Sequence, residues 1–223
     1  MRSGPAVLLA VVSVVTVGVL PVFLVGGLAV QLRSELGLSV SMIGLAGSAF
    51  FAVSALFARP LASVTERVGP MVALRVAAIG SAACLVGLAV APSVAWLIAA
   101  MCLAGAPNAL SQPAANEMLM ARVPAGRRAF AFAVKQSAVP ASTLLAGLAV
   151  PAIALTIGWR WAFVFAAALG LVAALSVPRL PWRRPAPQAR QASVSAGALL
   201  VALAAVTGMG AAAVNAMGTF VTI

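Results

Sequence analysis

The sequence predicts an all-α membrane protein: a six-helix bundle of two inverted three-helix repeats plus one additional transmembrane helix. Three observations carry this prediction. The 223 residues are 64% hydrophobic and only 8% charged, whereas soluble domains usually carry about 25% charged residues. The mean hydropathy is +1.15, too apolar for a chain that must cover a surface exposed to water. Long uncharged runs alternate with short segments that hold the arginines.

The uncharged runs are long enough to cross a bilayer. A helix that rises about 1.5 Å per residue needs about 20 apolar residues to cross a hydrocarbon core about 30 Å thick. The Ala91-Pro92-Ser93 turn signal divides the longest run into two spans. The first run exceeds the apolar core of a signal peptide, so we expect it to be retained. The predicted spans are 6–31, 38–58, 70–90, 94–120, 129–156, 160–177 and 195–222.

These spans define three segments of the chain. Residues 1–178 form a six-helix transmembrane half, 179–193 a basic, Pro-rich cytoplasmic linker, and 194–223 the seventh helix. Spans one to three and four to six form two triplets, and the last hairpin of each triplet turns at a glycine, Gly69 or Gly158. Since three is odd, the second triplet starts on the opposite side of the membrane, which is the inverted repeat typical of secondary transporters.

The net charge of +11 is a topology signal. With the N-terminus in the cytoplasm, eleven arginines fall in inner segments and only Arg33 and Arg160 in outer ones, with Lys135 left over. The positive-inside rule predicts this division for short loops. A nucleic-acid partner would need basic and aromatic residues gathered on one soluble face, which the sequence does not offer. We expect a multi-pass protein of the cell membrane, with a cytoplasmic N-terminus and the lipid bilayer as a partner.

The ionisable residues argue against an enzyme. The chain has no histidine, aspartate or tyrosine, and its acids are Glu35, Glu66 and Glu117. This composition removes histidine-activated nucleophiles, the usual metal clusters and most paired-carboxylate chemistry. Cys84 and Cys102 fit no metal-binding spacing and are interpreted as small packing residues. We expect no catalytic residue, no metal site and no cofactor.

The fourth span carries a row of amides. Its segment PNALSQPAANEM places Asn108, Gln112 and Asn116 at intervals of four residues, which puts them on one stripe of a helix. Amides in hydrocarbon are costly unless paired, so this stripe should face protein or a wet cavity. Two interpretations stay open: a face that lines a substrate path, and interhelical hydrogen bonds that only hold the bundle together. Pro107 and Pro113 favour the first, because each removes a backbone hydrogen bond.

The one lysine lies inside an apolar run, AFAVKQSAVPAS (131–142). Lys135 follows Arg128 by seven residues, about 10 Å into the fifth span. Burying its charge unpaired costs at least about 2.5 to 3.5 kcal/mol, so it should pair, face water or snorkel to the interface. Glu117 is the candidate ion-pair partner. The substrate-binding candidates are Asn108, Gln112, Asn116, Lys135 and Gln136.

Two segments resemble the major facilitator superfamily of secondary transporters. ASVTERVGP (62–70) resembles that family's cytoplasmic loop signature, Gly-x-Leu-Ala-Asp-Arg-x-Gly-Arg-Arg. Glu66 stands at the position of the acid, Arg67 at the first base and Gly69 at the turn glycine, so the resemblance implies a gating loop at these residues. The sequence departs from the signature at Ala62 and at Pro70-Met71. GWRWAF (158–163) resembles the start of the family's sixth span, and the basic linker resembles the loop between its two six-helix halves.

The resemblance implies a secondary active transporter that carries a small anionic or polar solute by alternating access. The chain then corresponds to the N-terminal half plus the seventh helix, with the missing C-terminal half or a second copy as the other wall of the path. Of the Gly-Pro-x-x-Gly-Gly pattern of drug and proton antiporters, only Pro140 and Gly147 remain, so antiport is not favoured over symport, and a coupling ion stays open. The alternative is a non-transporting membrane fragment with a structural or regulatory role. A seven-span receptor would need longer outer connections than Ala91-Pro92-Ser93.

Overall fold

The computed structural model describes residues 4–178 of the chain. Within this range six helical segments are long and apolar enough to cross a membrane, and no strand occurs among the described residues. The all-helical fold and the first six predicted spans are therefore confirmed. Arg2, the linker at 179–193 and the seventh span at 195–222 lie outside the described residues.

The described residues form ten elements, of which α2 belongs to no span and connects the first two. The first span is α1, the second α3, the third α4, the fourth α5, the fifth α6 with α7, and the sixth α8. A 3-10 turn η1 precedes α6, and a π-helical turn η2 follows α7. The bounds are α1 Gly4–Gly27, α2 Ala29–Leu36, α3 Val40–Val68, α4 Pro70–Ala89, α5 Val94–Arg122, η1 Ala125–Arg127, α6 Arg128–Gln136, α7 Ala138–Ala149, η2 Val150–Ala154 and α8 Trp159–Ser176.

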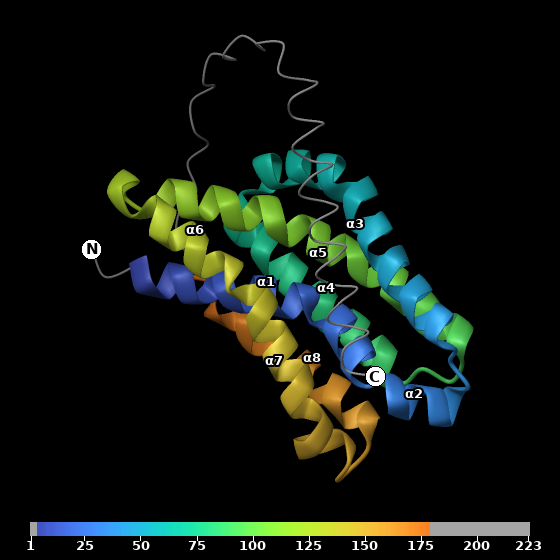
Figure 1. Ribbon diagram of the computed structural model, residues 1–223. Coiled ribbons are helices and arrows are strands. Elements are labelled where there is room, and N and C mark those ends of the chain that lie inside the picture. The colour runs from blue at the N-terminus through green and yellow to red at the C-terminus, as the bar shows by residue number, and fades with distance from the viewer. Residues whose placement is uncertain (1–3, 179–223) are drawn as a thin grey trace. The chain divides into compact units, whose positions relative to one another are not determined.

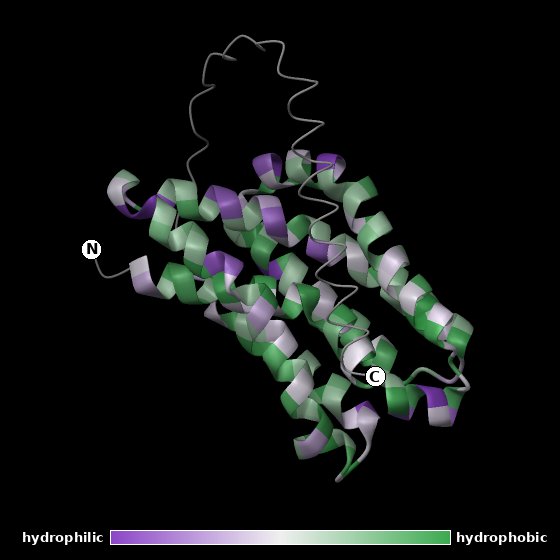
Figure 2. Cartoon of the chain, in the orientation of Figure 1, coloured by the Kyte–Doolittle hydropathy of each residue, from purple (hydrophilic) through white to green (hydrophobic). Residues whose placement is uncertain are grey.

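α1 lies at the centre of the bundle, in contact with α3, α4, α5, α6, α7 and α8 (Figure 1). About two thirds of its apolar length is buried inside the bundle, compared with about one tenth for α3. Hydrophilic residues gather on α2, on the last turns of α3, on the second half of α5 and on α6, while most of the remaining bundle is hydrophobic (Figure 2). Since hydrocarbon solvates apolar side chains, a surface of this kind is the one that a spanning bundle presents to lipid.

The helix contacts match between the two triplets of spans. α3 packs on α5 as α7 packs on α1, and α4 packs on α5 as α8 packs on α1. Gly69 before α4 (φ 86°, ψ 151°) and Gly158 before α8 (φ 103°, ψ 150°) share one backbone conformation, in a region that residues with a Cβ rarely adopt. An inverted repeat predicts such matching, and the repeat arrangement itself stays a prediction.

The second span is longer than the sequence predicted. We expected a helix at 38–58 followed by a loop, but α3 continues to Val68, so that the ASVTERV segment is helical. The uncharged run ends at Arg59 because charge marks the limit of the hydrocarbon, while the helix itself continues into the polar layer. At 29 residues, α3 is about 43 Å long and exceeds the roughly 30 Å hydrocarbon core.

The fifth span is divided at Ser137. Pro140 has no backbone N–H, and its ring conflicts with the carbonyl of the residue four positions earlier, Gln136. α6 accordingly ends at Gln136 and α7 begins at Ala138. The Ser137 hydroxyl donates to the Val134 carbonyl at 2.6 Å and satisfies one of the acceptors at this break. The proline thereby places Lys135 in the last turn of α6.

Three connections meet at the end of the bundle where α1 continues into α2. The Glu35 carboxylate accepts hydrogen bonds from the Trp159 indole N–H and from Arg160, which also forms a salt bridge with it. The Arg160 guanidinium lies 4.4 Å from the centre of the Trp159 ring and donates to the Ala91 carbonyl at 3.4 Å. These four residues, which we call the Glu35 cluster, join the connections between spans one and two, three and four, and five and six.

The hydrogen bond from Arg160, and then that from Trp159, holds the pKa of Glu35 below its ordinary value. A depressed pKa in the folded state adds stability that is complete above the ordinary glutamate pKa of about 4.3 and is lost as the pH falls through the lowered value. Both side chains of the ion pair are partly exposed, at 42% and 46%, so solvent screening limits this contribution to about 1 kcal/mol or less.

We therefore expect Glu35→Gln to lower the unfolding temperature of the purified protein slightly at pH 7 and by less at pH 3. The contribution of the ion pair decreases as the pH falls below the ordinary glutamate pKa of about 4.3, so the difference between the two proteins should shrink. Thermal unfolding of both proteins, followed by tryptophan fluorescence at the two pH values, measures this. A difference of the same size at both pH values would contradict the assigned role of the Glu35 carboxylate.

Candidate functional site

The amide stripe predicted on the fourth span lies on α5 and is divided into a buried and an exposed part. Asn108 is buried, with 5% of its surface exposed, while Gln112 is half-buried and Asn116 is exposed. The Asn108 amide nitrogen donates to the Ser54 hydroxyl of α3 at 2.9 Å. Asn108 thus serves the interhelical role that was the alternative interpretation of the stripe, and the open part of the stripe is at Gln112 and Asn116.

The surroundings of Asn108 leave little room for a solute. A Cβ built on Gly18 of α1 would lie 3.5 Å from the Asn108 side-chain oxygen and 3.3 Å from the Ser111 hydroxyl. The Ser111 hydroxyl donates to the Asn108 backbone carbonyl at 2.8 Å. The Asn108 side-chain oxygen is buried and has no hydrogen-bond partner. Gly18 lets α1 approach α5 closely here, which makes this crossing a packing contact between helices.

Lys135 and Asn116 form the polar contact between α6 and α5. The Lys135 ammonium donates to the Asn116 side-chain oxygen at 2.9 Å. Lys135 is 5% exposed, so its charge is enclosed by protein, whereas Asn116 opens to the surface. The structure therefore brings together two residues that the sequence placed on different spans. The exposed side of this contact is the Asn116 amide.

The expected pair of Lys135 with Glu117 is not formed. No salt bridge joins Lys135 to a carboxylate among residues 4–178. Successive residues on a helix are about 100° apart, so only one of Asn116 and Glu117 can point at α6, and Asn116 does. The Glu117 carboxylate is instead repelled by the Glu66 carboxylate of α3. Of the alternatives left open for Lys135, the structure shows a contact with a neutral amide, and the expected pairing with Glu117 was wrong.

The remaining predicted residues lie around this contact or at the end of α3. Gln136 is exposed and ends α6. Glu66 and Arg67 are exposed in the last turn of α3, and Gly69 is the buried turn residue between α3 and α4. Arg67 and Arg122 are each engaged in an interaction. The next cation before Lys135 on its own helix is Arg128, whose guanidinium donates to the carbonyls of Val123 and Met120.

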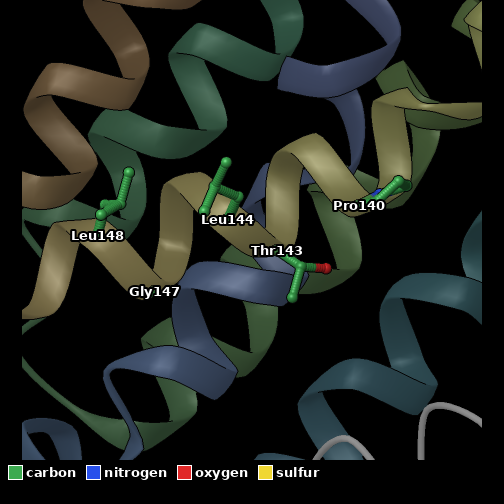
Figure 3. A pocket seen from close by; sticks show the side chains of 5 residues that line it. All are labelled: Pro140, Thr143, Leu144, Gly147 and Leu148. Atoms are coloured by element: carbon green, nitrogen blue, oxygen red, sulfur yellow. The ribbon is translucent and has the colours of Figure 1, made fainter.

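A separate surface hollow lies on α7 and carries little chemistry. Pro140, Thr143, Leu144, Gly147 and Leu148 line it, and Figure 3 shows Leu144 and Leu148 pointing to one side of α7 and Thr143 to the other. The Thr143 hydroxyl already donates to the Val139 carbonyl of its own helix at 3.2 Å. An apolar hollow of this kind suits a lipid chain or another helix, so Lys135 and Asn116 remain the candidate site.

Several contacts escaped the sequence analysis. Ser54 on α3 holds Asn108, and the Ser142 hydroxyl of α7 donates to the Thr16 carbonyl of α1 at 2.9 Å. A small polar residue inside an apolar span is the only signal that could have marked either serine. The described residues contain no group of three or more histidine, cysteine or acidic side chains that could hold a metal ion.

The comparisons with known proteins agree with this architecture. The sequence profile of the Major Facilitator Superfamily matches residues 7–223, and no curated protein matches significantly. Two crystal structures of a bacterial homologue of the human lysosomal transporter Spinster are similar. The inward-facing, occupied form is 21% identical, with a TM-score of 0.67 over 82% of this chain and 46% of that one. The inward-facing, unoccupied form is 22% identical, with a TM-score of 0.69 over 86% and 46%.

At these identities the two structures establish the fold alone. This chain spans about half the length of each of them. The matching family and both structures are transporters and not enzymes, which agrees with the expectation from the ionisable residues.

Proposed function

The chain belongs to the Major Facilitator Superfamily, and on that premise we propose that it forms part of a secondary active transporter for a small anionic or polar solute. The solute contacts Gln112 and Asn116 on α5 together with Lys135 and Gln136 on α6, and it moves across the membrane by alternating access. Asn108 supports this face by fixing α5 against α3. The other wall of the path is a second six-helix half or a second copy of the chain.

The observation that carries this proposal is the enclosed Lys135 ammonium with a neutral partner. A buried cation that lacks a counterion is costly, and such charges within spans commonly mark solute or ion pathways. Snorkelling to the interface, the alternative explanation of this lysine, would leave the ammonium in water, but the side chain is 5% exposed. A solute anion that reaches the ammonium past the exposed Asn116 would supply the missing charge.

Uptake into liposomes that contain the purified protein tests the proposal. Labelled lactate, succinate and phosphate are compared with labelled glycerol, which is small and neutral. We expect saturable uptake of at least one of these anions, above that of glycerol and inhibited by the same unlabelled anion. Uptake of all four solutes at the rate of protein-free liposomes would favour the alternative, a non-transporting membrane fragment.

We further propose that the end of the bundle with Glu66, Arg67 and Arg127 faces the cytoplasm of the cell, and that Glu66, Arg67 and Gly69 form a gate there. The clustering of arginines at this end supports the orientation. Arg67→Cys, in a protein with Cys84→Ala and Cys102→Ala, should react with an impermeant maleimide only after the cells are broken, while Ser34→Cys should react in intact cells. Labelling of Arg67→Cys from outside would show the opposite topology.

If Arg67 belongs to the gate, Arg67→Ala should slow uptake with little change in the solute concentration at half-saturation. A change confined to that concentration would place Arg67 at a binding site instead.

A further inference from the structure

The geometry of the Lys135 contact restricts the class of solute beyond its charge. The Asn116 side chain uses its oxygen to accept from Lys135 at 2.9 Å. Its amide nitrogen, bonded to the same carbon, makes no hydrogen bond to any residue that the structure describes. The ammonium and this amide nitrogen are therefore two donors held side by side, one charged and one neutral.

Within the described part of α6, Lys135 is the cation that contacts Asn116. Arg128 lies seven residues before Lys135, about 10 Å along α6, and already donates to two carbonyls. Glu117, the residue after Asn116, lies on the neighbouring surface of α5, where the Glu66 carboxylate repels it. A solute with one negative charge is compensated by Lys135. A second negative charge on the solute would be enclosed without a further counterion from the described part of α6, which is costly.

We propose that the solute of this site is a monocarboxylate, bound with one carboxylate oxygen on the Lys135 ammonium and the other on the Asn116 amide nitrogen. The proposal rests on the proposed function and specifies its solute. Dicarboxylates and phosphate bind more weakly because their second charge is uncompensated. Amino acids also bind more weakly, because their ammonium group would lie near Lys135 without an acidic partner on that side of α5.

Thermal unfolding of the purified protein in detergent tests this assignment through its four tryptophans. Sodium lactate, succinate and phosphate, and alanine as the zwitterion, are titrated at pH 7 with the ionic strength held constant by sodium chloride. A solute that binds only the folded protein raises the unfolding temperature by mass action. We expect lactate to stabilise with an apparent dissociation constant at least about tenfold lower than those of succinate, phosphate and alanine.

Asn116→Asp is the decisive variant. It preserves the size of the side chain and gives Lys135 a counterion, so the protein should fold and unfold at the wild-type temperature or above. The lactate effect should vanish, because the ammonium is neutralised and the amide donor is gone. Asn116→Ala, which removes the donor and leaves the ammonium, should weaken lactate binding about tenfold.

The outcomes separate this proposal from the proposed function. Stabilisation by succinate, phosphate or alanine that matches or exceeds that of lactate, and that disappears in Lys135→Met, would overturn the monocarboxylate assignment and leave solute binding at Lys135 standing. Undiminished lactate binding by the Asn116→Asp protein would also overturn the assignment. If none of these solutes stabilises the wild-type protein, both proposals fall.

Discussion

Gly105→Ala should lower the unfolding temperature by about 2 to 12 °C. A Cβ at this position of α5 would lie 2.5 Å from the Phe50 carbonyl oxygen and 3.0 Å from the Ser54 backbone nitrogen of α3. Both are backbone atoms, so α3 would have to move away from α5 to make room. Overpacking a tight contact costs up to about 3 kcal/mol, and a protein of this size loses about 2 to 4 °C per kcal/mol.

The same displacement should disturb the hydrogen bond from Asn108 to Ser54, which lies one turn further along α5. Gly147→Ala is the matched control, since this glycine also lies inside a helix and a Cβ there would meet nothing within 4 Å. Removing a flexible glycine from a helix interior should stabilise the control by up to about 1 kcal/mol. Equal unfolding temperatures for Gly105→Ala and the wild-type protein would show that α3 and α5 do not pack as described.

Lys135→Met should reduce the uptake of the transported anion about 10- to 100-fold while leaving the protein as stable as the wild type or more so. Methionine preserves most of the length of the side chain and removes the charge-assisted hydrogen bond, which is worth about 1.5 to 3 kcal/mol. Replacing a buried charge that has no counterion with an apolar group is often neutral or stabilising. Slower uptake without a loss of stability would indicate that Lys135 contacts the solute, whereas a purely structural role predicts that both uptake and stability fall.

Lys135→Arg should impair uptake less than the methionine change does. Arginine keeps the positive charge, but its planar guanidinium is larger than the ammonium and would not sit on the Asn116 oxygen in the same enclosed space. Uptake by the reconstituted variants, normalised to the amount of folded protein, measures both effects. If the Lys135→Met protein took up the anion at the wild-type rate, Lys135 would not contact the solute and would serve only to anchor the helix.

The membrane-spanning architecture could be predicted from the sequence because hydrocarbon imposes a single rule on the whole chain. Every spanning segment must be apolar and about 20 residues long, so charges such as Arg59 and Arg128 mark where spans end. Gly69 and Gly158 could be predicted as turns for a related reason, since each adopts a backbone conformation that favours glycine. Each of these features depends on a short stretch of the sequence, so the sequence alone predicts it.

The pairing of side chains between helices could not be predicted in the same way. The sequence located Lys135 and its need for a partner, but the choice between Asn116 and Glu117 depends on the rotation of α5 about its axis. That rotation follows from packing, including the close approach at Gly105. Glu35 and Arg160 are 125 positions apart, and no periodic pattern in the sequence links them.

The most direct test of the central claim, that an ammonium group at position 135 contacts the solute, restores that group chemically. The test uses Lys135→Cys in a protein without Cys84 and Cys102, in which the space of the lysine side chain is left open. The measured solute is whichever of lactate, succinate and phosphate the wild-type protein transports best, and we expect this variant to transport it slowly. Alkylation with 2-bromoethylamine rebuilds a side chain with the length and charge of lysine, whereas iodoacetamide adds a neutral group. With complete modification checked by mass spectrometry, we predict that uptake returns to at least half of the rate with Lys135 after the first reagent and stays low after the second. Equal uptake after both reagents would contradict the account.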